Sequence, residues 1–144
     1  MYEISTDLAR VDVSATHSFL TQTYWSPGIS IEVVRRAIQN SVCVSAWNGD
    51  KQVGFARAAT DKATFAYLAD VYVLEDHRGQ GLSRRLVQAL LHTPDLQGLR
   101  RLMLATRDAH GLYEKFGFKS LAAPGRFMEL HNLNAYAAAA RSDA

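Results

Sequence analysis

The sequence predicts an α/β fold, in the α+β arrangement of one mixed sheet flanked by helices. The first half of the chain indicates two helices followed by three strands joined by tight turns. The second half indicates a helix, a short buried strand and another helix. Tight turns join antiparallel strands, whereas a helix between two strands is typical of a parallel crossover. The sheet is therefore expected to be mixed, with helices on its faces.

The first helix is expected to run from about residue 14 towards Tyr24, because apolar residues recur there at helical spacing. Asp12 and Ser14 are both candidates for its N-cap. Residues 25–28, Trp-Ser-Pro-Gly, end it. Ser30 is a good N-cap for a second helix over residues 31–38. Two short helices therefore precede the first strand.

Three strands are expected next, over residues 42–47, 52–60 and 64–74. Asn48-Gly49-Asp50 joins the first two, and Asn-Gly is the strongest short-range signal for a hairpin. Asp61-Lys62 forms the second polar break. The pattern predicts an antiparallel meander.

An amphipathic helix opens the second half of the chain. Its apolar face consists of Leu82, Leu86, Val87 and Leu90. His92-Thr93-Pro94 ends this helix, and residues 102–105 then indicate a buried strand with a parallel neighbour.

The last elements are expected to be short. A helix is predicted over residues 109–115, with Gly117 as its stop. Phe118 and residues 127–130 are predicted to form the final strands. Residues 134–144 are rich in alanine and have helix propensity, but they have little to pack against.

The composition indicates one domain spanning residues 1–144. The chain has a mass of 16.0 kDa, with 48% hydrophobic and 21% charged residues, as an average globular domain has. Cys43 is the single cysteine and the histidines are scattered, so neither a disulfide framework nor a metal site is expected. No apolar run could span a membrane, and Met1-Tyr2-Glu3-Ile4-Ser5 does not start a signal peptide. These observations predict a soluble, cytoplasmic protein.

The net charge of +2 is unevenly distributed. Residues 78–126 contain nine basic and three acidic residues. Such a segment attracts a phosphate-bearing ligand, either a cofactor or a nucleic acid. Aromatic residues do not alternate with the basic ones in this segment, which argues against nucleic acid. For most of these arginines, taken one by one, an ordinary solvated helix surface is the favoured interpretation.

The strongest local signal is the turn between the third strand and the amphipathic helix. Gly79 and Gly81 allow a ligand to approach the backbone closely, and the first amides of the helix point towards that ligand. The sequence therefore predicts an anion site. A dinucleotide-binding fingerprint fails because Arg84 stands where a third glycine is needed, and no Gly-Lys-Ser/Thr follows to make a Walker loop.

Two blocks resemble the GNAT superfamily of N-acetyltransferases. Arg78-Gly79-Gln80-Gly81-Leu82-Ser83 is similar to its Gln/Arg-x-x-Gly-x-Gly/Ala signature. Gly111-Leu112-Tyr113-Glu114-Lys115-Phe116-Gly117-Phe118 is similar to its Leu-Tyr-Glu-Lys-x-Gly-Phe segment. The resemblance covers roughly residues 42–130 and implies the GNAT fold, with acetyl-CoA as co-substrate.

The resemblance also implies roles for individual residues. The strand before the signature pairs with the pantetheine arm of acetyl-CoA, which implicates Val71 and Val73. The amides of Arg78, Gly79, Gln80, Gly81, Leu82 and Ser83 are implied to hold the pyrophosphate. Tyr113 matches the family's proton donor to the departing thiolate. Thr106 stands where many members have a cofactor-contacting Asn.

Two positions depart from the family pattern. Ser83 replaces the last Gly/Ala of the signature, but its side chain is small and binding is expected to survive. Many members carry a Glu as general base on the strand, and the matching residue here is Tyr67. Asp70 is the nearest carboxylate, although strand alternation places it on the opposite face from Tyr67 unless a bulge intervenes. A water chain ending at Asp70, a backbone carbonyl or Tyr67 remains equally open as the base.

The resemblance implies that the acetyl acceptor is a primary amine of a small molecule or a peptide. Tyr24 and Trp25 are candidates for one wall of the acceptor pocket, with core packing as the alternative. Arg57 is a candidate partner for an acidic group of the substrate. A non-catalytic acyl-CoA sensor acting on a partner protein is the alternative function. The chain is expected to be a monomer or a homodimer.

Overall fold

The computed structural model describes residues 1–137 and confirms the predicted mixed sheet with flanking helices. The strands are β1 (Tyr2–Ser5), β2 (Ser41–Asn48), β3 (Lys51–Thr60), β4 (Phe65–Val73) and β5 (Arg101–Leu104). The helices are α1 (Val13–Leu20), α2 (Ile31–Gln39), α3 (Leu82–Leu91) and α4 (His110–Glu114). Short 3-10 turns occur at Leu8–Arg10, Glu75–His77, Pro94–Leu96 and Pro124–Arg126.

The strands form one sheet in the order β1-β2-β3-β4-β5. The first four are antiparallel, and β5 is parallel to β4 because α3 makes the crossover between them. β1 was not among the expected strands. It pairs with the far end of β2, Tyr2 opposite Asn48, and nothing in its four residues distinguishes it from a loop.

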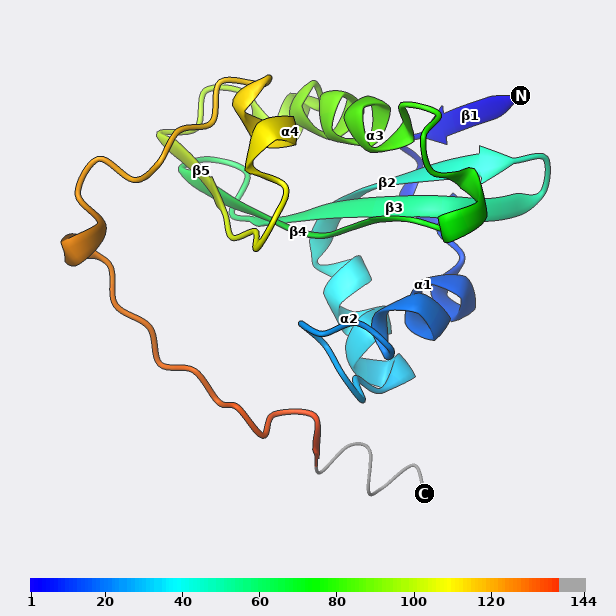
Figure 1. The fold of residues 1–144 in the computed structure, drawn as a ribbon, viewed down its shortest axis with the longest axis horizontal. Helices are drawn as coiled ribbons and strands as arrows, with labels where there is room; N and C mark the ends of the chain where they lie inside the picture. The colour runs from blue at the N-terminus through cyan, green and yellow to red at the C-terminus, as the bar shows by residue number, and fades with distance from the viewer. Residues whose placement is uncertain (138–144) are drawn as a thin grey trace.

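Helices cover both faces of the sheet (Figure 1), with α3 and α4 on one side and α1 and α2 on the other. Leu86, Val87 and Leu90 of α3 are fully buried against the first face. Phe55 and Tyr72 form the centre of the second core, under α1 and α2. The sheet is thus buried on both faces, and its edges remain as the places where backbone is open.

The predicted caps account for the positions of α1 and α2. Asp12 rather than Ser14 caps α1, accepting a hydrogen bond from Ala15 N. Ser30 caps α2 in the same way. The buried Gln52 of β3 fixes α1 to the sheet, because its amide donates to Thr16 Oγ1 and its oxygen accepts from Asp12 N. α1 ends at Leu20 and does not reach Tyr24.

The prediction of final strands was wrong. Within residues 1–137, neither Phe118 nor residues 127–130 form a strand. A strand needs a neighbour to satisfy its backbone. Residues 119–123 share a cavity with β5 but do not pair with it, and the chain then runs away from the sheet (Figure 1). Of the expected C-terminal helix, residues 134–137 contain only a turn and one helical residue, and residues 138–144 lie outside the described part.

Candidate active site

β4 and β5 separate beyond the middle of β4. Their parallel pairing extends from Phe65 opposite Arg101 to Leu68 opposite Leu104. β4 continues to Val73, and no strand among residues 1–137 pairs with it on that side. Residues 69–73 therefore present a free backbone edge, which we call the open edge.

The backbone of Val73 points towards the open edge. Leu74 N donates to Val53 O of β3 at 2.8 Å, and backbone directions alternate along a strand. The backbone N–H and C=O groups of Val71 and Val73 must then face away from β3. Arg78 confirms this direction, because its Nε donates to Val73 O at 2.9 Å. The open edge and the glycine turn are therefore in direct contact.

The glycine turn leads into α3 without a side-chain cap. Gly79 and Gly81 have φ values of 78° and 75°, in the left-handed region that favours glycine. Gly81 is the N-cap of α3, so no side chain bonds the first amides of the helix. A Cβ built at either glycine would meet nothing within 4 Å. This space at a helix N-terminus fits an anion such as a pyrophosphate.

A cavity of about 400 Å³, which we call the loop cavity, adjoins the open edge. Its lining includes predicted cofactor residues and predicted acceptor residues: Val71, Val73, Arg78, Ser83, Tyr24 and Trp25. The structure therefore brings these two groups together. Gly79, Gln80 and Gly81 do not line this cavity, and the side chain of Leu82 is buried in the core beneath α3.

The aromatic wall of the loop cavity is held from two sides. Trp25 Nε1 donates to Asp70 Oδ1 at 2.8 Å, and the rings of Tyr24 and Trp25 meet edge to face. The guanidinium of Arg107 lies 3.9 Å from the centre of the Tyr24 ring. Sequence reasoning missed Arg107, whose only signal was a positive charge after the parallel strand. This cation–π contact joins the β5–α4 loop to the α1–α2 loop.

Asp70 lies in a β-bulge. Phe55 pairs with Tyr72 and Arg57 with Ala69, so Asp70 and Val71 together oppose the single residue Ala56. Asp70 adopts a φ of 57°, and its side chain turns to Arg57, whose Nε donates to Oδ2 at 2.6 Å. Because this bulge intervenes, strand alternation does not place Asp70 on the opposite face from Tyr67. Both oxygens of Asp70 are already hydrogen-bonded.

Tyr67 lies apart from the loop cavity. Its side chain is 39% exposed and borders none of the cavities described here. Arg57 likewise faces Asp70 and Ser41 rather than the loop cavity. Neither of these two candidate substrate contacts therefore lines the loop cavity, although Asp70 links Arg57 to Trp25.

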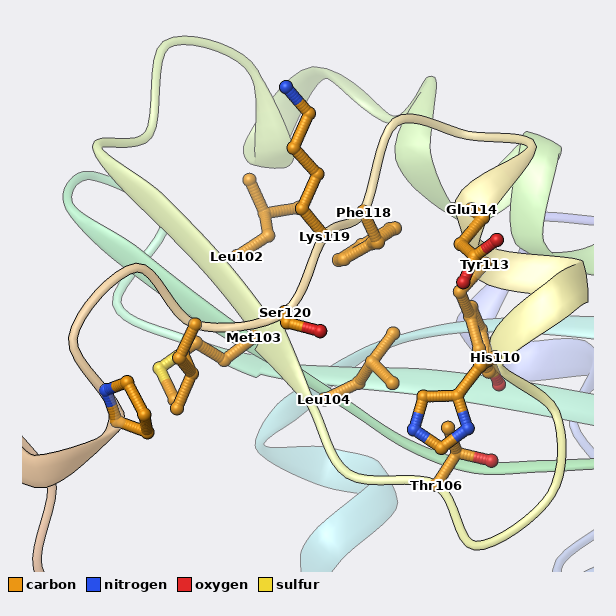
Figure 2. Close-up of a pocket in the computed structure, with 12 residues that line it drawn as sticks. Leu102, Met103, Leu104, Thr106, His110, Tyr113, Glu114, Phe118, Lys119 and Ser120 are labelled. Atoms are coloured by element: carbon orange, nitrogen blue, oxygen red, sulfur yellow. The ribbon is translucent and has the colours of Figure 1, made fainter.

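Tyr113 and Thr106 border a second cavity of about 340 Å³, which we call the β5 cavity. Figure 2 shows Leu104 of β5 and His110 and Tyr113 of α4 around it. Burial raises the pKa of Tyr113 above its ordinary value. Thr106 Oγ1 accepts from Ala109 N at 3.0 Å and so helps to start α4.

The two cavities have different linings. Tyr113 is absent from the lining of the loop cavity, and Val71 and Val73 are absent from that of the β5 cavity. The contact between Arg107 and Tyr24 connects the β5–α4 loop with the α1–α2 loop, which carries part of the lining of the loop cavity. Tyr113 of α4 and the open edge of β4 therefore belong to neighbouring parts of one end of the sheet, beyond the last β4–β5 pair.

Residues 1–137 contain neither of two other kinds of feature. No group of three or more His, Cys, Asp or Glu side chains is placed to hold a metal ion there. No helix in the same range has the length and apolarity to cross a membrane.

The chain is similar to known proteins in both sequence and fold. The sequence model of the acetyltransferase (GNAT) family matches residues 7–118. The curated "Putative acetyltransferase FG08082" of Gibberella zeae is 34% identical over 137 residues, covering 79% of this chain and 76% of that protein. A crystal structure of a GNAT-family protein from Xanthomonas campestris pv. campestris has a TM-score of 0.90 and 45% identity, covering 94% of this chain and 96% of that one.

A more distant structure is a predicted acetyltransferase of Clostridium acetobutylicum, solved with acetyl-CoA. Its TM-score is 0.66 at 18% identity, with 94% of this chain and 98% of that chain covered. At this identity the likeness shows the fold alone. The family match and the two nearer relatives carry the assignment: the chain belongs to the GNAT acetyltransferase family.

Proposed function

We propose that the protein transfers the acetyl group of acetyl-CoA to a primary amine of a small molecule or a peptide. The observation that carries this proposal is the contact between the open edge of β4 and the glycine turn, made by Arg78 and Val73. Membership of the GNAT family supports it, as does the C. acetobutylicum relative solved with acetyl-CoA.

The residues present fit acetyl-CoA as a co-substrate. The amides around Gly79 and Gly81 and at the start of α3 would hold the pyrophosphate, because they form a clear, uncapped helix N-terminus. The backbone of Val71 and Val73 would pair with the amide groups of the pantetheine arm, as a strand edge pairs with an extended peptide. Bound acetyl-CoA supplies an activated thioester.

The proposed reaction is direct transfer. The amine nitrogen forms a bond to the acetyl carbon, the carbon–sulfur bond breaks, and the amine loses one proton. An amide N–H at the open edge stabilises the developing negative charge on oxygen. The Tyr113 hydroxyl donates its proton to the thiolate, as the resemblance to the family implies. A chain of waters ending at Asp70, or a backbone carbonyl, accepts the proton of the amine; Tyr67, the third candidate, lies outside the loop cavity.

A second candidate function is a non-catalytic acyl-CoA sensor. One observation favours it: Tyr67 stands where relatives of the family carry a Glu, and both oxygens of Asp70 are bonded to Trp25 and Arg57. In this case the loop cavity would bind acetyl-CoA without assisting the removal of a proton.

An acceptor screen separates the two functions. The protein is incubated with acetyl-CoA and single amines of four classes: amino acids, polyamines, aminoglycosides and peptides with free N-termini. Thiol release is followed by absorbance, and each product is identified by mass spectrometry. The proposal expects amine-dependent thiol release matched by an acetylated product. Binding of acetyl-CoA without turnover in any class supports the sensor instead.

A further inference from the structure

The rim of the loop cavity carries a cation that pairs with no carboxylate of residues 1–137. Arg107 is exposed, and its guanidinium carbon lies over the Tyr24 ring, 3.9 Å from the ring centre. No ion pair in the described part of the chain uses Arg107. A guanidinium that rests on a ring by its flat face keeps its N–H groups directed outwards in its own plane, where a carboxylate can accept two of them.

The lining of the loop cavity is rich in aromatic rings. Phe19, Tyr24, Trp25 and Tyr72 all border it, and Phe19 stacks on Tyr72 with ring centres 4.0 Å apart. Tyr24 and Trp25 are 56% and 41% exposed. Large rings that stay exposed in the wall of a cavity are typical contacts of an apolar or aromatic ligand. The part of the acceptor that lies against this wall is therefore expected to be apolar.

Acidic groups are not offered to a ligand in the loop cavity. Of the residues in its lining within residues 1–137, only Arg78 is charged. Asp70 touches the aromatic wall through Trp25, but both of its oxygens are hydrogen-bonded and its side chain is 8% exposed. Asp108, beside Arg107 in the sequence, borders neither the loop cavity nor the β5 cavity. Polyamines and aminoglycosides carry several positive charges, so this surroundings of cations does not suit them.

We propose that the acceptor is an apolar α-amino acid, in the first place an aromatic one, and that Arg107 binds its carboxylate. This inference rests on the proposed acetyl transfer and names the substrate class for it. The amine and the carboxylate of an α-amino acid are bonded to the same carbon, so their two binding groups must lie close together. Arg107 and the open edge both lie beyond the last β4–β5 pair, Leu68 opposite Leu104. The side chain of the amino acid would pack against Tyr24 and Trp25.

Binding of acetylated products tests the ligand class without turnover. N-acetylphenylalanine and its primary amide share the ring and the acetamide, but only the first has a carboxylate, and neither has an amine to titrate. Each is titrated by calorimetry into the full chain with saturating coenzyme A. The acid should bind at least about tenfold more tightly than the amide, because it alone forms a charge-assisted pair. Equal Kd values for the two compounds, or no binding of either, overturn the proposal.

Arg107→Gln tests the assigned residue. Its Kd values for the acid and the amide should agree within about twofold, because glutamine brings no charge to the carboxylate. Arg36→Gln is the matched control, since Arg36 of α2 is exposed and borders neither cavity, and it should keep the wild-type preference. Both arginines are exposed, so both variants should retain the wild-type circular dichroism spectrum and Tm. A preference for the acid that persists in Arg107→Gln overturns the role of Arg107.

Turnover distinguishes a failure of this inference from a failure of the proposed function. Phenylalanine, phenylalaninamide and spermidine are each offered with acetyl-CoA to wild type and to Arg107→Gln, and kcat/KM is compared for the same acceptor so that its amine pKa cancels. The variant should lose at least about tenfold with phenylalanine and at most about twofold with phenylalaninamide. Equal losses for both, or a preference for spermidine, overturn the substrate class and leave acetyl transfer standing. Carboxylate-dependent binding without any acetylation supports the ligand class and overturns the transfer.

Discussion

Arg57 on β3 and Asp70 on β4 form an ion pair across the bulge, with Arg57 Nε and Asp70 Oδ2 2.6 Å apart. The side chain of Asp70 is only 8% exposed and that of Arg57 21%. The second oxygen of Asp70 accepts from Trp25 Nε1. This pair therefore ties the sheet to the loop that carries Tyr24 and Trp25.

Replacing Asp70 with Asn should lower stability, because it leaves the Arg57 charge without its partner. We expect a loss of about 2 kcal/mol in the free energy of unfolding, measured with urea. Arg57→Gln should cost a similar amount, and the double variant less than the sum of the two. If Asp70 only positions Trp25, kcat/KM should fall in both Asp70→Asn and Arg57→Gln. The pH profile of each variant should then be the same as that of the wild type. A stable Asp70→Asn protein that loses kcat would instead make Asp70 the general base.

Removing the hydroxyl of Tyr113 should slow turnover without weakening binding. Tyr113→Phe is expected to lower kcat by about 10²-fold, the lower end of general acid catalysis, because a thiolate is a fair leaving group. The Kd for acetyl-CoA should change by no more than a few-fold. Tyr136→Phe, on the opposite face of the sheet, is the control and should keep wild-type kcat. Unchanged turnover in Tyr113→Phe would remove this residue from the mechanism.

Cys43 should make the protein less stable at alkaline pH. Burial raises its pKa from 9.0 to about 12, so between these values the unfolded thiol loses its proton while the folded thiol keeps it. The unfolded state then binds fewer protons, and stability falls as pH rises, by at most about 1.4 kcal/mol per pH unit.

Comparison with Cys43→Ala isolates this effect. The difference in unfolding free energy between wild type and variant should be constant below pH 8 and should shrink between pH 9 and pH 11, because alanine has no proton to lose. A difference that stays constant up to pH 11 would show that the folded thiol titrates normally.

The features that could be predicted from the sequence are those that depend on neighbouring residues in the chain. The Asn48-Gly49 hairpin, the Ser30 cap and the turn at Gly79 and Gly81 each depend on a few adjacent residues, and the structure contains all of them. The crossover to β5 was also predictable, since the apolar face of α3 has a clear helical period.

Features that depend on distant partners were harder to predict. β1 is a strand only because β2 lies beside it, and residues 127–130 fail to be one because no neighbour is present in the described chain. The bulge at Asp70 arises from pairing with β3, and the contact between Arg107 and Tyr24 joins two loops far apart in sequence. The hydrophobic periodicity of the sequence could not predict these contacts between distant segments.

The most direct test of the acetyl-CoA site is calorimetric binding to wild type, Gly81→Ala and Gly98→Ala. Gly81 and Gly98 have φ values of 75° and 73° and equally open surroundings, so both alanines bring the same backbone strain. Gly98 lies between α3 and β5, away from the loop cavity. The account predicts one acetyl-CoA bound per wild-type chain, unchanged affinity for Gly98→Ala, and at least tenfold weaker binding for Gly81→Ala, about 1.4 kcal/mol. Equal affinity in all three proteins would contradict it.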